Sequence, residues 1–148
     1  IRDRIMTIRN ILQRKGSSVI AIDSRATVRD AVKTMDIHRI GALVIQGAAG
    51  ACNGIFTERD VMRALASRDA PILDDPIEKH MTERPQSVSP DTPVEEAMEI
   101  MTERRFRHLP VMQNDRLGGI VSIGDLVNYR IHQTEREAEA LKSYIRSG

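Results

Sequence analysis

The stretch Gly54-Ile55-Phe56-Thr57-Glu58-Arg59-Asp60 decides the fold, because it returns later in the chain as Gly119-Ile120-Val121-Ser122-Ile123-Gly124-Asp125. Each copy reads glycine, two apolar residues, a hydroxyl residue, two variable residues and aspartate. The two copies lie 119 − 54 = 65 residues apart. A repeat at this period indicates a duplicated structural unit rather than a local coincidence. The sequence therefore predicts two similar halves.

The chemistry of the motif is that of a strand running into a helix. The apolar pair predicts the end of a buried strand, and the hydroxyl of Thr57 or Ser122 can accept a hydrogen bond from the first turn of a helix. Such a helix start attracts anions, and the aspartate (Asp60 or Asp125) can accept hydrogen bonds from the vicinal hydroxyls of a ribose. The plainer alternative is a capping box that only starts the helix. Two copies at matching places favour a paired ligand site.

Length and composition limit the classes of protein. The chain has 148 residues, 41% of them apolar, which is enough for a compact domain with a core. A net charge of +1 and 3% aromatic residues argue against a nucleic-acid partner. No apolar run approaches the roughly 20 residues that span a bilayer, and no signal-like leader opens the chain. The single cysteine, Cys52, can form no internal disulfide, so we expect a cytoplasmic protein.

The first half reads as strand, helix, strand, strand and helix, after an amphipathic lead-in over residues 1–16. Short strands are expected at 19–22, at 40–45 and in the stretch that ends at Phe56. Thr27 is expected to cap the first helix through a capping box with Asp30, and the motif threonine to open the second. The inward side of that second helix is expected to hold Val61, Met62, Leu65 and Ala66.

The second half repeats this order. The first repeat is expected over 17–70 and the second over 77–132, joined by a proline-containing linker at 71–76. An extended piece at 87–88 precedes a helix for which Thr92 is the expected cap and Pro93 the first residue.

Strands at 109–112 and 117–121 lead into a last helix from Asp125. Its expected inward residues are Leu126, Val127 and Ile131. The helix is expected to continue through a charged tail, 133–148, which is either solvated or a contact surface for a second copy of the chain.

These stretches resemble a tandem pair of cystathionine-β-synthase-type (CBS) domains, also called a Bateman module, over roughly residues 7–131. The resemblance rests on both motif copies, on Arg107-His108-Leu109-Pro110-Val111, and on the openings Ala26-Thr27-Val28 and Ser87-Val88-Ser89-Pro90-Asp91-Thr92-Pro93-Val94. It implies a mixed α/β (α+β) fold in which two βαββα repeats pack through their sheets with pseudo-twofold symmetry. Two clefts would lie between the repeats. The short chain is similar to small stand-alone bacterial members of this family.

The resemblance also implies a ligand class, namely adenosine-containing nucleotides such as AMP, ADP, ATP, NAD(H) or S-adenosylmethionine. Asp60 with Thr57, and Asp125 with Ser122, would hold the ribose hydroxyls and a ribose or phosphate oxygen. The positions that match adenine contacts in the first cleft are Ser18, Val19, Ile40 and Ala42. The matching positions in the second cleft are Val88, Arg107, His108 and Leu109.

Arg59 stands beside the first motif aspartate, and its guanidinium fork suits phosphate oxygens. An exposed helix arginine is the plainer alternative. The second copy has Gly124 at this position, so a phosphate there needs another cation from Arg104, Arg105 or Arg107. The two clefts therefore need not be equivalent.

The histidines and the cysteine give no sign of catalysis or metal binding. His108 precedes a buried strand and can either stack on a base or serve the structure. The others (His38, His80 and His132) share no metal-ligand spacing with one another or with Cys52. No base stands beside the cysteine in sequence, so we predict neither a metal site nor a catalytic nucleophile.

The sequence thus predicts a regulatory module without catalytic activity or a catalytic cofactor. An adenine nucleotide would enter a cleft and change how two copies in a homodimer, or a regulated partner protein, pack together. The alternative is a protein-interaction or scaffold module with vestigial nucleotide clefts, which the difference between Arg59 and Gly124 favours. Membrane and nucleic-acid partners are not expected.

Overall fold

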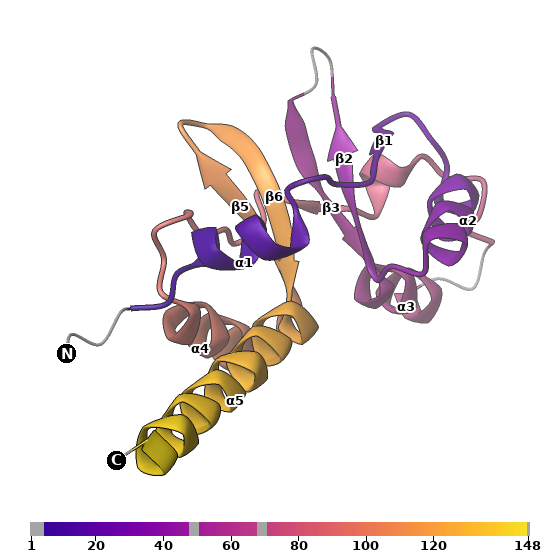
Figure 1. Ribbon diagram of the computed structural model, residues 1–148. Coiled ribbons are helices and arrows are strands. Elements are labelled where there is room, and N and C mark those ends of the chain that lie inside the picture. The colour runs from indigo at the N-terminus through magenta and orange to yellow at the C-terminus, as the bar shows by residue number, and fades with distance from the viewer. Residues whose placement is uncertain (1–4, 48–50, 68–70, 148) are drawn as a thin grey trace.

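A computed structural model describes residues 5–47, 51–67 and 71–147 (Figure 1). The elements, in chain order, are α1 (Ile8–Lys15), β1 (Ala21–Asp23), α2 (Val28–His38), β2 (Ala42–Gln46), β3 (Cys52–Thr57), α3 (Glu58–Ser67), the 3-10 helix η2 (Ile77–Lys79), β4 (Thr82–Glu83), α4 (Val94–Arg104), β5 (His108–Gln113), β6 (Arg116–Ser122) and α5 (Ile123–Ser147). The prediction of a mixed α/β fold with two similar halves is confirmed.

Two small sheets lie side by side, and the helices of each half pack against their own sheet (Figure 1). The first sheet has the order β1-β2-β3-β4, in which β1 and β2 are parallel and the other pairs are antiparallel. The second sheet pairs β5 with β6. The strand expected at 87–88 is reduced to one parallel bridge between Val88 and Val111. That bridge occupies the place that β1 has beside β2.

The start of α2 is the predicted capping box. The backbone N–H of Asp30 donates to Thr27 Oγ1 at 3.2 Å, and the backbone N–H of Thr27 donates to Asp30 Oδ2 at 3.1 Å. Val28, Ala31 and Met35 are buried along one side of the helix. The apolar residues of this helix, at helical spacing, thus form one buried face.

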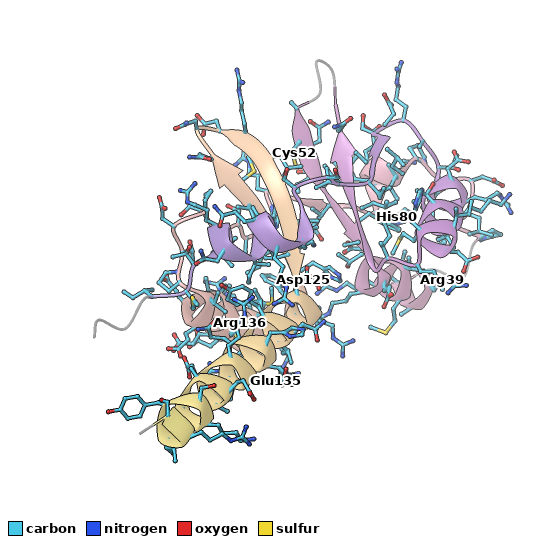
Figure 2. All side chains as sticks on the ribbon, viewed as in Figure 1. Arg39, Cys52, His80, Asp125, Glu135 and Arg136 are labelled. Atoms are coloured by element: carbon cyan, nitrogen blue, oxygen red, sulfur yellow. The ribbon has the colours of Figure 1, made fainter. Side chains whose placement is uncertain are left out.

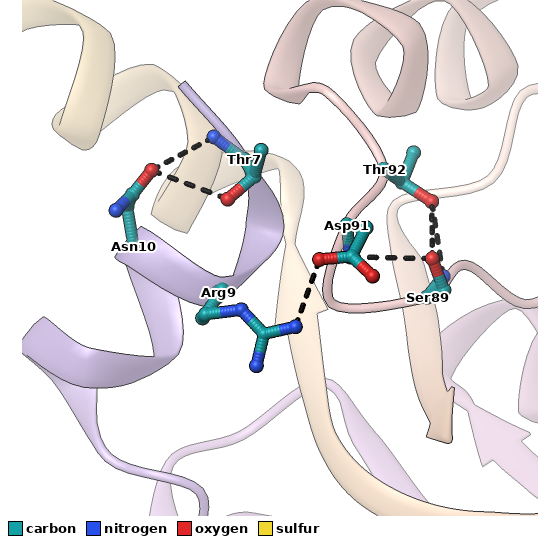
Figure 3. Close-up of polar contacts among 6 residues, drawn as sticks. All are labelled: Thr7, Arg9, Asn10, Ser89, Asp91 and Thr92. Carbon is teal, nitrogen blue, oxygen red and sulfur yellow. Dashed lines mark hydrogen bonds and ion pairs between the residues drawn. The ribbon is translucent and has the colours of Figure 1, made fainter. Parts of the chain in front are cut away.

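The predicted cap of α4 is wrong. The helix begins at Val94, and Pro93, with extended backbone angles, stands directly before it. The hydroxyl of Thr92 accepts a hydrogen bond from the backbone N–H of Ser89 at 3.0 Å instead (Figure 3). The hydroxyl is thus used by the turn that precedes the helix.

Two separate clusters of buried residues form the core, and the chain crosses between them. The first cluster comprises Val28, Ala31, Met35, Leu43, Ile45, Phe56, Ala64, Ile72 and Ile77. The second comprises Ile8, Ile11, Val88, Val94, Ala97, Met101, Leu109, Val111, Val121 and Leu126. Helix α1 therefore packs in the core of the second half, whereas Ile72 and Ile77, from the connection between the halves, pack in the core of the first.

The start of α1 is fixed to the segment before α4. The backbone N–H groups of Ile8 and Arg9 donate to the carbonyls of Thr92 and Pro90 at 2.9 and 2.8 Å. Arg9 Nη2 also lies 2.8 Å from Asp91 Oδ1 (Figure 3). These contacts join residues more than 80 positions apart, so the lead-in belongs structurally to the second half.

The inward face of α3 differs from the prediction. Met62 and Leu65 are 62% and 61% exposed, and Ala66 is also exposed. The buried positions are Asp60 and Ala64, one helical turn apart. The hydrogen-bonded motif aspartate takes an inward position, so three of the four predicted apolar side chains turn outward, while Val61 is partly buried and packs against the first core as predicted.

The inward side predicted for helix α5 is also partly wrong, but the helix continues through the C-terminal tail as predicted. Leu126 is buried, but Val127 and Ile131 are 39% and 50% exposed. Its C-terminal part projects away from the body, and Leu141, Tyr144 and Ile145 lie exposed along it (Figure 1). None of the described helices is both long and apolar enough to cross a membrane.

Candidate functional site

A cavity of about 1060 Å³ lies between the two halves. The first half contributes the end of β3 and the start of α3, and the chain after β4 contributes Pro85 and Gln86. The second half contributes the end of α4, the start of β5 and Ile123. This volume matches the clefts in which proteins hold drug-sized ligands.

Asp60 is the buried acid of this cavity, with 5% of its surface exposed. Its Oδ2 accepts hydrogen bonds from the backbone N–H of Thr57 at 2.9 Å and from the Thr57 hydroxyl at 3.2 Å. Its Oδ1 accepts one from the hydroxyl of Thr82 at 3.0 Å. These bonds form the plainer capping arrangement and also fix the carboxylate at the cavity wall, where Oδ1, with one hydrogen bond, can accept a further one.

The charged side chains around Asp60 make the cavity cationic. The lining residues with formal charge are Glu58, Arg59, Asp60, Arg63, Arg105 and Arg107. Four arginines against two carboxylates leave an excess of two positive charges. Arg59 crosses between the halves, because its Nη1 donates to the carbonyl oxygen of Arg105 at 2.7 Å. The cavity can therefore attract an anion and bring both halves to it.

An apolar wall stands beside these charges. It is made by Ile55, Met62, Pro85, Met101, Phe106 and Ile123. Phe106 is partly buried, so part of its ring remains accessible. A flat, apolar ring system has a surface to lie on here, while a charged group attached to it can reach the arginines.

His108 and Glu58 meet over Gly41. A Cβ on Gly41 would lie 2.9 Å from Glu58 Oε1 and 3.2 Å from His108 Cε1, so a larger residue here would have to displace the end of the Glu58 side chain. Burial lowers the pKa of His108, and this effect outweighs the opposing carboxylates of Glu58 and Asp125. The imidazole is accordingly neutral at neutral pH and suited to contact with an uncharged ring.

The cavity contains residues that the sequence placed in two different clefts. It brings Thr57, Arg59 and Asp60 together with Arg107 and His108, which were assigned to the other cleft. Ile40 lines a smaller cavity of about 400 Å³ nearby. The remaining predicted residues line neither cavity (Ser18, Val19, Ala42, Val88, Leu109, Ser122 and Asp125). A role for any of these residues in nucleotide binding stays a prediction.

The second motif is built alike but has a different partner. The backbone N–H of Ser122 donates to Asp125 Oδ2 at 2.8 Å, as in the first motif. The same carboxylate oxygen lies 2.7 Å from Lys15 Nζ, and the ammonium also donates to the carbonyl of Ile120 at 2.8 Å. Figure 2 shows Asp125 at the first turn of α5, next to α1. A neutral hydroxyl thus contacts the first aspartate and an ammonium the second.

Partial burial alone would raise the pKa of the Asp125 carboxyl, but the hydrogen bonds from Lys15 and the Ser122 backbone outweigh it and hold the pKa below its ordinary value. The ionised carboxylate therefore stabilises the fold above about pH 4, and this stability is lost as the pH falls through the lower folded-state pKa. We expect the stability difference between wild type and Asp125→Asn to be largest near pH 6 and to shrink by pH 3. Urea unfolding at both pH values measures it.

The control for this pH prediction is the same substitution in a Lys15→Met background. There the difference should depend less on pH, because the ammonium that lowers the carboxyl pKa is gone. An equal difference at both pH values in the wild-type background would contradict the assignment.

Two residues that contact the motif aspartates carry little or no signal in the sequence. Thr82 reaches Asp60 from 22 positions away, and Lys15 reaches Asp125 from 110 positions away. Only the crossed packing of the two halves makes these contacts. A partial signal exists for Thr82, because 82 − 17 = 65 places it opposite Ser17 in the repeat.

Metal binding and catalysis by cysteine find little support in the described part of the chain. No three His, Cys, Asp or Glu side chains within residues 5–47, 51–67 and 71–147 gather as a metal site would require. The thiol of Cys52 is partly buried, and burial raises its pKa, which outweighs the opposing backbone hydrogen bond of Gly54. A protonated thiol is a poor nucleophile.

Solved structures with the same architecture cover most of the chain. A CBS-domain-containing protein from Agrobacterium tumefaciens superposes with a TM-score of 0.82, at 38% identity over 88% of this chain and 97% of that one. A CBS domain pair in complex with 5′-methylthioadenosine and S-adenosyl-L-methionine gives 0.75, at 26% identity over 88% and 99%. A CBS domain protein from Pyrobaculum aerophilum complexed with AMP gives 0.70, at 27% identity over 81% and 89%.

Sequence comparison gives the same result. A mitochondrial CBS domain-containing protein of Arabidopsis thaliana is 37% identical over 150 residues, which cover 96% of this chain and 73% of the relative. The family model described as the CBS domain matches twice, at residues 8–67 and 77–132. The chain therefore belongs to the CBS domain family, of which it contains a tandem pair.

Proposed function

We propose that this chain is a regulatory sensor that binds a phosphorylated adenosine nucleotide in the cavity beside Asp60. The observation that carries the proposal is the buried carboxylate of Asp60 in a cavity between the halves, with arginines around it and an apolar wall next to it. The carboxylate suits ribose hydroxyls, the arginines suit phosphate, and the apolar wall suits adenine. The AMP complex of the Pyrobaculum aerophilum relative supports this ligand class.

The charge of the cavity favours nucleoside phosphates over S-adenosylmethionine. The excess of two arginines attracts the phosphates of AMP, ADP or ATP, whereas it repels the positive sulfonium of S-adenosylmethionine. The relatives that hold S-adenosyl-L-methionine and AMP are 26% and 27% identical to this chain, so the ranking rests on the charge of the cavity and not on identity. We therefore rank AMP, ADP and ATP first, NAD(H) next and S-adenosylmethionine last.

The bond from Arg59 to the Arg105 carbonyl suggests how binding would be sensed. This guanidinium already joins the two halves, and a phosphate in the cavity would compete with the carbonyl for it. The ligand then shifts the relative positions of the halves by the difference between its affinities for the two arrangements. A regulated partner, or the second chain of a homodimer, would respond to that shift.

Asp60→Asn tests the proposal most directly. The substitution keeps the shape of the side chain but removes the negative charge of the carboxylate that accepts hydrogen bonds from the ribose hydroxyls. We expect AMP affinity to fall roughly ten- to hundredfold, since a hydrogen bond to a charged group contributes about 1.5–3 kcal/mol. Isothermal titration calorimetry measures the change.

Asp125→Asn is the matched control, because it changes the equivalent aspartate outside this cavity and should leave the affinity there nearly unchanged. A thermal-shift assay adds a second readout, because AMP at 100 times its dissociation constant stabilises the fold by about 2.7 kcal/mol. AMP binding to Asp60→Asn with wild-type affinity would refute the proposed site.

A scaffold function remains the second candidate, and the exposed side chains of α5 favour it. Leu141, Tyr144 and Ile145 are 61%, 77% and 67% exposed on a helix that projects from the body. In this alternative the helix binds a partner protein and the cavity is vestigial. In either case we propose a binding module without catalytic activity, in keeping with a chain built of two CBS domains.

A further inference from the structure

We propose that Lys15 closes the second aspartate to nucleotides, so that the chain binds one nucleotide rather than two. The inference rests on the proposed function of the Asp60 cavity and assigns Lys15 as the residue that sets the number of ligands. It depends on a difference between two motifs that otherwise fold alike.

The two aspartates have hydrogen-bond partners of different kinds. Asp60 is contacted by the neutral hydroxyl of Thr82 at 3.0 Å, and Asp125 by the ammonium of Lys15 at 2.7 Å. A ribose hydroxyl can replace another hydroxyl with little change in charge. Replacing an ammonium leaves the carboxylate without its counterion and the ammonium without its acceptor, which is far more costly.

The backbone around α1 fixes where the ammonium lies. Ile8 and Ile11 of this helix are buried in the second core, with 0% and 2% of their surface exposed. Leu12 packs so closely on Gly119 that a Cβ there would lie 2.9 Å from Leu12 Cδ2. Lys15 follows in the last turn, directly above β6, where it also donates to the Ile120 carbonyl at 2.8 Å. The helix thus delivers the charge to the motif without help from a ligand.

The Lys15 side chain is held more firmly than an ordinary surface lysine. It is 33% exposed and the Asp125 side chain 26% exposed, so the pair is only partly screened by solvent. Two acceptors, the carboxylate and the Ile120 carbonyl, share the ammonium. Since a nucleotide would have to break a charged hydrogen bond to reach Asp125, we expect affinity there to be reduced roughly ten- to hundredfold.

Calorimetric titration with AMP tests the inference through stoichiometry. Wild type is expected to bind one AMP per chain, and Lys15→Met to bind two. Methionine keeps the length and apolar stem of lysine but cannot pair with the carboxylate. Adding Asp125→Asn to Lys15→Met should return the stoichiometry to one. Lys15→Gln serves if the methionine variant does not fold, as judged by circular dichroism.

Arg14→Met is the control for the loss of a positive charge, because Arg14 is exposed on the same turn of α1. It should leave the stoichiometry at one. Two AMP per wild-type chain, or one AMP per chain in both wild type and Lys15→Met, would overturn the inference.

Failure of the proposed function gives a different pattern. If wild type binds no AMP, the proposed sensor site at Asp60 is wrong. A single site that appears with Lys15→Met and disappears with Asp125→Asn would still support the closing role of Lys15. The absence of any AMP site in both wild type and Lys15→Met would overturn that role as well.

Discussion

Replacing Phe56 with alanine should lower the free energy of unfolding by about 3–5 kcal/mol, the usual loss for a buried aromatic side chain. Phe56 has no exposed surface and lies in the first core, opposite Leu43 in the β2–β3 register. The smaller side chain leaves a cavity that the short strands around it cannot fill, because they are held in register on both sides. Urea unfolding followed by circular dichroism measures the change.

Phe106→Ala is the matched control, since these are the two phenylalanines of the chain. Phe106 is only partly buried and lines the cavity, so its removal should cost less stability but weaken AMP binding. Phe56→Ala, under conditions where it remains folded, should cost more stability and weaken AMP binding less. Equal losses of stability in the two variants would contradict this division between core and site.

The sequence predicts the two units well because their signal is local. The repeated motif, the capping box at Thr27 and the buried face of α2 each depend on residues within one or two helical turns. The same local pattern misplaced the inward sides of α3 and α5. In α3 the inward positions are Asp60 and Ala64, and in α5 only Leu126 is buried, which the helical spacing of apolar residues alone does not reveal.

The arrangement of the site was less predictable because it depends on crossed packing. Helix α1 joins the second core and Ile77 the first, so each motif meets side chains from distant parts of the chain. The sequence identified Thr57, Arg59 and Asp60, which the structure places together in one cavity. It assigned Arg107 and His108 to the other cleft and gave no indication that Lys15 lies beside Asp125. The first grouping arises only when the two halves pack, and the second only when α1 packs in the second core.

Gly54→Ala should lower the free energy of unfolding by about 3 kcal/mol, at the upper end of the usual loss from overpacking. Gly54 is buried where β3 meets β4, and a Cβ there would collide with the carbonyl oxygen of Thr82. The Thr82 carbonyl carbon and Met81 Sδ would lie at 3.2 and 3.3 Å. Because the obstacle is backbone, no rotation of a side chain relieves it. Urea unfolding provides the measurement.

The same substitution should also weaken AMP binding, since moving β4 away from β3 removes the Thr82 hydroxyl from Asp60 and shifts Pro85 and Gln86 at the cavity wall. Gly118→Ala is the matched control, because a Cβ there would lie an ordinary 3.6 Å from the Val111 carbonyl oxygen. It should change stability by about 1 kcal/mol or less and leave AMP binding unchanged. If Gly54→Ala has the same free energy of unfolding and the same AMP affinity as wild type, β4 does not hold the aspartate in place. The glycine that opens the first motif would then be needed for neither the sheet nor the site.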